Sequence, residues 1–463
     1  MINTKALREK ILDLAMRGKL VPQDPTDEPA SVLLDKIKEE KEQLIKDKKI
    51  KKEKALPEIS KEEIPYEIPD SWEWLSIRDI STITMGQAPK SSNVNNEGNG
   101  FEFHQGKTFF SSMYVEQSGV YTTSPNKVIN PPAIIMSVRA PVGDVNLIDR
   151  KIVIGRGLAA FVPGNGIELL FLYNYLQTQK SYLLSLSTGT TFKAINSQTV
   201  RTINVPLPPL KEQKRIVAKL EELFALIDTI ESNQLEFKQL AEQLDKKVLD
   251  LAMRGKLVPQ DPTDEPASVL LDKIKEEKEQ LIKDKKIKKE KPLPKISKEE
   301  IPYDIPENWK WTRLSDISKE LFAGGDKPRN FAKEKTNEFN IPIYANGMTK
   351  NGLYGYTNIA KVTERALTIS ARGTIGYSVI RNEPFVPIVR LIVVIPIKEY
   401  VDLTFVKCLF EHIIENGEGT SIKQLTIPKI KPRLIPLPPT KEQKRIVAKI
   451  EMIRESIQRI DFE

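Results

Sequence analysis

Residues 12–54, LDLAMRGKLVPQDPTDEPASVLLDKIKEEKEQLIKDKKIKKEK, decide how this chain is organised, because the same 43 residues recur without a change at 249–291. The likeness continues to a tryptophan pair in each copy, IPYEIPDSWEW at 64–74 and IPYDIPENWKW at 301–311. After each pair the sequences diverge. A perfect repeat of this length indicates that the chain contains a duplicated structural unit.

A second repeat closes each divergent segment. PLPPLKEQKRIVAKLE at 206–221 returns as PLPPTKEQKRIVAKIE at 436–451. The repeated stretches form a frame around two variable inserts, residues 72–206 and 309–436. This layout predicts one scaffold carrying two domains of the same kind with different contact residues.

The frame after Pro209 has the apolar spacing of a coiled coil. Its apolar residues alternate in steps of four and three over about five heptads, with Gln234 interrupting the series. They are Ile216, Leu220, Leu223, Ile227, Ile230, Phe237, Ala241, Leu244, Val248 and Leu251. We therefore predict a helix over 211–253, which would span roughly 65 Å at about 1.5 Å per residue.

The two ends of the chain complete a second such helix. Ile446, Ile450, Ile453, Ile457 and Ile460 continue the C-terminal copy in the same register. Thr4, Leu7, Ile11 and Leu14 align with the second half of the intact helix. The sequence thus predicts a circularly permuted duplication, in which antiparallel pairing of the intact and the split helix would give a pseudo-twofold molecule.

Each insert combines strand-like and helix-like runs. AIIMSV at 133–138 and ALTISA at 366–371 have the composition of buried strands, whereas 168–179 and 403–414 are helical. Residues 27–54, with Pro29 near the start, are typical of a solvated amphipathic helix. The fold class we predict is α+β, with two globular α/β domains separated by a long antiparallel coiled coil.

Three pairs of glycine-bearing turns correspond between the inserts: GQAP at 86–89 with GDKP at 325–328, RAPVG at 139–143 with RGTIG at 372–376, and GTTFK at 189–193 with GTSIK at 419–423. In or beside these turns stand Lys, Arg and Gln, which contact phosphates and base edges. The sequence-predicted DNA-binding residues are Gln87, Lys90, Arg139, Lys193, Lys327, Arg329, Arg372 and Lys423.

Composition narrows the function classes. The net charge of +8 favours a polyanionic partner, and the single cysteine, Cys408, excludes an intrachain disulfide and a multi-cysteine metal site. We predict no metal site. No apolar run reaches the roughly 18 to 20 residues that cross a bilayer, and the N-terminus lacks a signal-peptide core. We therefore expect a soluble, cytoplasmic protein that makes no membrane contact.

No catalytic motif withstands inspection. NPPA at 130–133 carries alanine where adenine methyltransferases need an aromatic ring to stack on the target base. GRGLAA at 155–160 follows a strand, but Pro163 comes too soon for the helix of a dinucleotide site. Cys408 and His412 lie on an apolar helix and are expected in the core. We predict no catalytic residue in this chain.

The doubled frame with alternating variable domains closely resembles the specificity subunits of type I restriction-modification systems, along essentially the whole chain. The motif Pro-Leu-Pro-Pro-x-x-Glu-Gln-x-x-Ile at 206–216 and 436–446 carries this resemblance. The domains then follow: 1–71, the N-terminal half of the split helix with the charged helix and lead-in; 72–206, target-recognition domain 1; 207–308, a central region with the long spacer helix; 309–436, target-recognition domain 2; and 437–463, the C-terminal helix that completes the spacer.

The resemblance also implies partners. They are double-stranded DNA, two methyltransferase (modification) subunits and, in the full complex, two restriction subunits. No cofactor is expected in this chain, since S-adenosylmethionine and ATP with magnesium would belong to the partner subunits. Each target-recognition domain would recognise one half of a bipartite, asymmetric DNA site, the first domain the 5′ half and the second the 3′ half.

Under the same resemblance, the frame serves subunit assembly. The predicted partner-binding residues are Lys211, Gln213, Arg215, Lys441, Gln443 and Arg445. A different hypothesis stays open, in which the chain is a free-standing sequence-specific DNA-binding or architectural protein that binds tightly on its own. A self-sufficient methyltransferase is disfavoured by the missing motifs.

Overall fold

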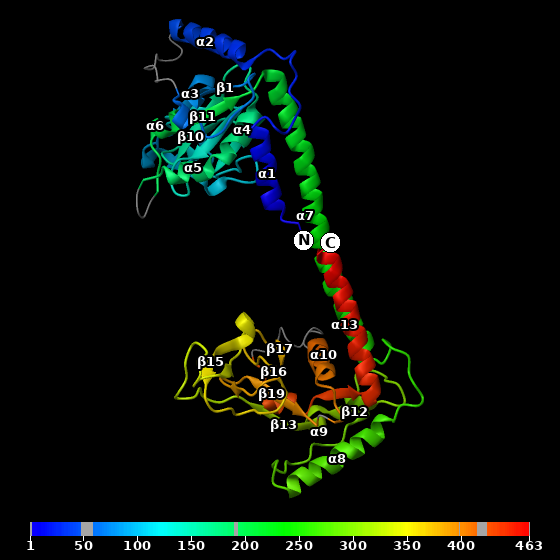
Figure 1. Ribbon diagram of the computed structural model, residues 1–463. Helices are drawn as coiled ribbons and strands as arrows, with labels where there is room; N and C mark the ends of the chain where they lie inside the picture. The colour runs from blue at the N-terminus through cyan, green and yellow to red at the C-terminus, as the bar shows by residue number, and fades with distance from the viewer. Residues whose placement is uncertain (1, 48–58, 189–192, 398, 414–423, 463) are drawn as a thin grey trace. The chain divides into compact units, whose positions relative to one another are not determined.

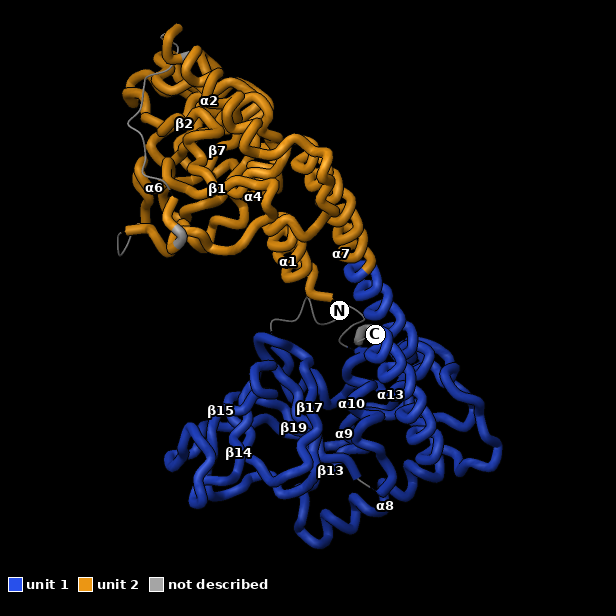
Figure 2. Tube along the Cα trace, turned by 45° about the horizontal axis from the view of Figure 1, so that its top comes forward, with its two compact units in different colours: residues 1, 234–463 blue, residues 2–233 orange. Residues whose placement is uncertain are grey.

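The computed structural model describes residues 2–47, 59–188, 193–397, 399–413 and 424–462 (Figure 1). It forms two compact units, which Figure 2 distinguishes by colour: unit 2 contains Ile2–Asn233, and unit 1 contains Gln234–Glu463. Each unit holds one of the two variable inserts. Mixed helices and sheets with one long helix confirm the predicted α+β class.

Unit 2 contains the first set of elements. Its helices are α1 (Thr4–Met16), α2 (Ala30–Lys46), α3 (Ile77–Ile80), α4 (Leu169–Thr178), α5 (Lys180–Ser185), α6 (Ser197–Arg201) and the first part of α7 (Leu210–Met253). Its strands are β1 (Glu73–Ser76), β2 (Ser81–Met85), β3 (Val94–Asn95), β4 (Phe101–His104), β5 (Tyr121–Thr122), β6 (Val128–Ile129), β7 (Ala133–Ser137), β8 (Val145–Ile148), β9 (Ile152–Ile154), β10 (Leu158–Pro163) and β11 (Asn204–Leu207).

Unit 1 contains the second set. Its helices are the rest of α7, α8 (Ala267–Lys283), α9 (Leu314–Ile317), α10 (Leu403–Ile413), α12 (Ile427–Ile430) and α13 (Thr440–Phe462). Its strands are β12 (Lys310–Arg313), β13 (Ser318–Ala323), β14 (Ile341–Tyr344), β15 (Leu353–Thr357), β16 (Ala366–Ile369), β17 (Ser378–Arg381), β18 (Val386–Pro387), β19 (Ile392–Pro396) and β20 (Leu434–Leu437).

The central sheet has the same strand order in both units. It runs β2-β10-β7-β8 in unit 2 and β13-β19-β16-β17 in unit 1, with every neighbouring pair antiparallel. A second sheet follows in each unit, β3-β5-β4-β9-β6 and β15-β14-β18, and a two-strand ribbon ties the ends of each insert together, β1 with β11 and β12 with β20. The two inserts therefore share one scaffold, as the matching turns predicted.

The register of the central sheet corrects one predicted correspondence between the inserts. Ala159 pairs with Met85, and at the same place in unit 1 Ile392 pairs with Ala323. Gly86 follows Met85 and Gly324 follows Ala323, so Gly86 corresponds to Gly324. Alignment on Pro89 and Pro328 predicts Gly325 instead. The loop after β13 is thus one residue longer than the loop after β2, which the proline-based alignment could not show.

Within unit 2, α1 packs antiparallel against the first part of α7. Leu7 and Ile11 of α1 share a core with Ile216, Leu220 and other seam residues of α7. Arg8 also pairs with Asp228, and its guanidinium lies over the ring of Phe224. The N-terminal helix therefore lies along the predicted coiled-coil seam.

Unit 1 repeats this arrangement with α13. Val248 of α7 shares a core with Ile446 and Ile450, and Arg454 binds both carboxylate oxygens of Asp245. The predicted seam is tight only in part, since Leu244 and Ile460 are 46% and 62% exposed. Heptad spacing fixes which face of a helix is apolar, but burial also needs a partner residue opposite.

The buried core of each insert agrees with the sequence expectations. All five residues of β7 and all four of β16 are buried, as predicted for 133–138 and 366–371. Cys408 lies on α10 in the core, and burial raises the pKa of its thiol to about 12, which suits a structural position. Among the described residues, no helix is both long and apolar enough to cross a membrane.

Candidate nucleic-acid interface

One edge of the central sheet collects the predicted DNA-binding residues of unit 2. β2 and β7 both run antiparallel to β10, so the loops after β2 and β7 meet the loop before β10 at this edge. Hydrogen bonds hold the loops together: the Gln87 N–H donates to the Ile154 carbonyl, that of Val138 to Gly157, and that of Ala140 to Lys193. We call residues 86–90, 139–140, 155–157 and 193–194 the rim of unit 2.

The rim of unit 2 is cationic. Gln87, Lys90, Arg139 and Lys193 are all exposed there, so the structure brings the sequence-predicted residues of this domain to one edge. Arg156, between two buried glycines, adds a cation that the sequence analysis did not select. Within the described ranges, no ion pair joins Arg139, Arg156 or Lys193 to an acidic side chain. These charges are therefore available to a polyanion.

The corresponding edge forms the rim of unit 1, which we define as residues 324–329, 371–373 and 388–390. Lys327, Arg329 and Arg372 are exposed on it. The Lys327 amino group lies 4.6 Å from the centre of the Phe331 ring. The last predicted residue, Lys423, lies outside the described residues. Its neighbour Leu425 donates to the Ala371 carbonyl, 3.0 Å away.

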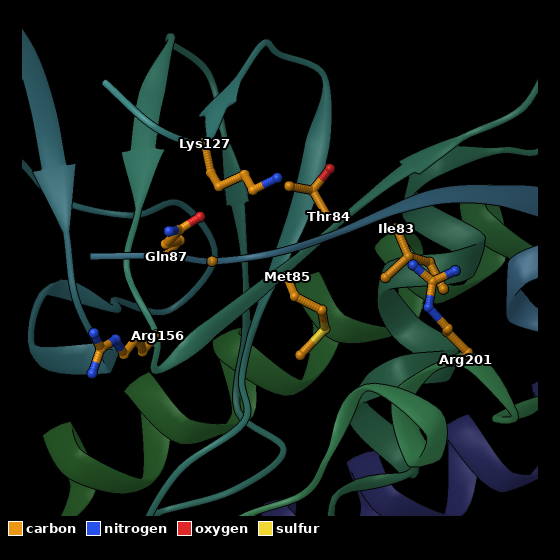
Figure 3. Close-up of a pocket in the computed structure, with 8 residues that line it drawn as sticks. Ile83, Thr84, Met85, Gln87, Lys127, Arg156 and Arg201 are labelled. Carbon is orange, nitrogen blue, oxygen red and sulfur yellow. The ribbon is translucent and has the colours of Figure 1, made fainter. Parts of the chain in front are cut away.

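A hollow of about 520 Å³ opens at the rim of unit 2. Gln87, Lys127 and Arg156 line it together with Arg201 and part of β2 (Figure 3). In this view Gln87 lies on the same side as Arg156 and Lys127, and Arg201 lies apart from them beyond Met85. Three cations and one amide around an open hollow favour an anionic or hydrogen-bonding ligand over an apolar one.

The repeated frame forms an internal clasp, at which the frame residues bind their own chain. In unit 2 the Glu212 carboxylate is 1% exposed and accepts hydrogen bonds from the Trp72 indole, at 3.0 Å, and from the Gln23 amide. One helical turn on, Arg215 pairs at 2.7 Å with the buried Asp27. The start of α7 is thereby fixed to the loop after α1 and to the start of the insert.

Unit 1 repeats the clasp contact for contact. Trp309 and Gln260 donate to Glu442, and Arg445 pairs with Asp264 at 2.7 Å. Gln23 and Asp27 come from the perfect repeat, and the other clasp residues come from stretches that recur with few changes, so equivalent residues make the same contacts twice. The clasp therefore explains physically why the frame recurs in the chain.

This clasp changes the interpretation of the predicted partner-binding residues. Gln213 and Gln443 are fully buried and bind backbone groups of their own unit, so their part in any partner interface would be indirect. Arg215 and Arg445 are half-buried in their ion pairs. Of the six residues, only Lys211 and Lys441 are exposed. Partner binding by these residues stays a prediction.

The carboxyl groups of Glu212 and Glu442 in the two clasps should make the stability of the fold depend on pH. Burial raises the pKa of Glu212 and Glu442 above 4.5, against the lowering effect of their indole and amide donors. The folded chain then holds these protons more tightly than the unfolded chain, so this contribution to stability is lost as the pH rises through the raised pKa.

The double variant Glu212→Gln/Glu442→Gln should remove that loss, and its free energy of unfolding should fall less between about pH 5 and about pH 7.5. Urea unfolding at both pH values measures the difference from the unaltered chain. Equal pH slopes for the two proteins would contradict a raised pKa at these carboxyls.

Comparison with known proteins adds independent information. The sequence profile described as "Type I restriction modification DNA specificity domain" matches residues 69–237 and 306–460. The chain is 30% identical to the type I restriction enzyme EcoAI specificity subunit of Escherichia coli, over 99% of this chain and 90% of that protein. It is 32% identical to the EcoEI specificity subunit of the same species, over 69% of this chain and 63% of that protein.

A solved HsdS subunit from Thermoanaerobacter tengcongensis is 28% identical over 50% of each chain, with a TM-score of 0.34. A TM-score this low does not by itself establish a shared fold. The sequence matches alone establish the relationship. Each matched segment of the profile includes one variable insert and part of the frame.

Proposed function

Since this chain belongs to the DNA specificity subunits of type I restriction-modification systems, we propose that it recognises a bipartite, asymmetric DNA sequence and directs adenine methylation and restriction there. The observation that carries this is the match of both inserts to the specificity profile, together with a cationic rim at the same sheet edge of each insert. In this proposal unit 2 recognises the 5′ half-site and unit 1 the 3′ half-site.

The chain supplies recognition, and its partners supply the chemistry. We propose two methyltransferase subunits bound to the frame and two restriction subunits in the full complex, in the cytoplasm where the chromosome lies. S-adenosylmethionine, and ATP with magnesium, would be held by those partners. Matching clasps in the two units support this stoichiometry, because they would offer two methyltransferase subunits equivalent surfaces.

The rim cations supply most of the affinity in this proposal. Phosphate contacts dominate protein–DNA affinity and release counterions, so binding depends steeply on salt. The double variant Arg139→Glu/Lys193→Glu, assembled with its methyltransferase partner, should bind target DNA at least about ten-fold more weakly, with a slope of log K against log salt that is shallower by about one for each lost phosphate contact.

Lys151→Glu is a single-charge control, since Lys151 is exposed directly before β9 and Arg156 follows the end of that strand. It should leave both the affinity and the salt slope close to those of the unaltered complex. If the double variant bound DNA as this control does, the rim of unit 2 would not be part of the DNA interface.

The free-standing DNA-binding hypothesis is not favoured. A relative named as a restriction-enzyme subunit aligns with 99% of the chain. Tight specific binding of the isolated chain, unchanged by the methyltransferase subunit, would be needed to revive it.

A further inference from the structure

The turn that leads from the second sheet into the central sheet has the same length and the same closing hydrogen bond in the two units. In unit 2 the Leu158 N–H donates to the Gly155 carbonyl at 3.0 Å, and in unit 1 the Leu391 N–H donates to the Ile388 carbonyl at 3.2 Å. The strands that follow, β10 and β19, begin with the same register on both neighbours, before the shift between Ser318 and Glu320 of β13. We call residues 155–158 and 388–391 the crossover turns.

The central residues of the crossover turns differ in chemistry. They are Arg156 and Gly157 in unit 2, and Val389 and Arg390 in unit 1. Arg156 and Val389 occupy the same sequence position in the turn, and both are exposed. Arg156 lies between two buried glycines, whereas Val389 lies between buried Ile388 and exposed Arg390. The turn thus keeps its length and its place between the sheets, while the side chain at one rim position changes from a cation to an aliphatic group. Of the four central residues, only Val389 and Arg390 have a positive φ.

Val389 has no evident structural reason to be there. Its φ is 46° and that of Arg390 is 66°, a region that L residues avoid and β-branched residues avoid most. Its N–H donates to the Gly325 carbonyl at 2.8 Å, and the Asn346 amide donates to its carbonyl at 2.7 Å, so the backbone is held in place. The side chain is nevertheless 59% exposed. A strained position that presents an aliphatic side chain to solvent is typical of a functional contact.

Arg156 lies where it can act together with other recognition groups. It lines the hollow at the rim with Gln87 and Lys127 (Figure 3). Arginine binds guanine O6 and N7 with two parallel hydrogen bonds, and an aliphatic side chain contacts the thymine methyl group. Phosphates are the same at every base pair, so a position whose chemistry changes between domains on one scaffold is suited to base edges.

We propose that the crossover turns are base-recognising elements of the two units, with Arg156 recognising guanine in one half-site and Val389 contacting the methyl group of thymine in the other. This inference rests on the proposed function, since it names residues that determine which sequence the complex methylates. Beside Val389, the Arg390 guanidinium donates to the Gln424 amide oxygen at 3.2 Å.

Two variants test the turns in the full complex. Arg156→Ala removes the guanidinium, and Val389→Gly removes the aliphatic group while relieving the positive φ. Both side chains are exposed, so neither truncation opens a buried cavity. Matched controls are Lys151→Ala at the start of β9 and Val269→Ala, an exposed valine of α8. Each chain is expressed with its methyltransferase partner in an unmodified host, and methyladenine is mapped by long-read sequencing.

Each turn variant should relax one base pair of one half-site. For Arg156→Ala, preference for guanine at that base pair should fall by about 5- to 150-fold, the range of a bidentate arginine–guanine contact. Val389→Gly should accept bases other than thymine at one base pair of the other half-site, with no loss of thermal stability. The controls should give the motif of the unaltered chain.

An unchanged motif, or a rate lowered evenly over all sites, would overturn this inference, because phosphate-contacting or purely structural residues behave in that way. The unaltered chain separates this failure from a failure of the proposed function. If its bipartite, chain-dependent methylation is present while the turn variants keep the same motif, only the inference falls.

Discussion

Replacing Trp309 with alanine is expected to lower the free energy of unfolding of unit 1 by about 3–5 kcal/mol, the cost of a large truncation in a packed core. Trp309 is 1% exposed, and its indole donates to Glu442 at 3.0 Å. The truncation therefore opens a cavity and also takes a donor from a buried carboxylate. Hydrogen exchange measured separately over the two units should show the loss in unit 1.

Two further variants sharpen this prediction. Trp309→Phe keeps much of the apolar ring and loses the indole donor, so its cost should be closer to about 1 kcal/mol. Trp72→Ala makes the matched change in unit 2 and should move the destabilisation there, since Trp72 donates to Glu212 in the same geometry. A Trp309→Ala chain with unaltered exchange in unit 1 would contradict the clasp.

Breaking the ion pair between Arg445 and Asp264 should lower the free energy of unfolding by nearly as much. Arg445→Met removes the partner of Asp264, whose side chain is 1% exposed. A buried charge without its partner costs about 3–5 kcal/mol, and we expect about 2–3 kcal/mol because the Arg445 side chain is itself 35% exposed and therefore screened.

The double variant Arg445→Met/Asp264→Asn should recover most of this loss, since the remaining amide carries no charge. Arg215→Met and Arg215→Met/Asp27→Asn are the matched pair in unit 2. Urea unfolding followed by hydrogen exchange measures both. If the double variant were as unstable as Arg445→Met, the ion pair would not be the source of the loss.

Much of the fold follows from the repeats and from apolar patterning. The long helix was predicted over 211–253 and extends from Leu210 to Met253. The strands at 133–138 and 366–371 and the helices after them were found because buried strands and helices have distinct apolar patterns. The packing of α1 on α7 was expected because the apolar spacing of the N-terminal helix matches that of the second half of the long helix.

The clasp could not be predicted in the same way. Glu212 and Trp72 are 140 positions apart, and a charged motif at a helix start is ordinarily expected at the surface. The one available signal was that the tryptophan pair and the KEQKR motif recur together in both copies of the frame. Without the three-dimensional contacts, that recurrence fitted partner binding equally well.

Arg156 was missed for a different reason. The motif GRGLAA at 155–160 resembles a dinucleotide loop only superficially, and strand β10 begins within it at Leu158, where such a loop needs a helix. Its place beside Gln87 depends on the pairing of β2 with β10, strands more than seventy residues apart. Strand order of this kind is set by tertiary packing and cannot be obtained from local periodicity.

The most direct test of the account is to map methyladenine in an unmodified host that expresses this chain with its methyltransferase partner. The account predicts a single bipartite motif with two unlike halves and a fixed gap, which disappears when the chain is omitted. Methylation that continues without the chain, or a motif with one half only, would contradict the assignment of sequence recognition to the two units.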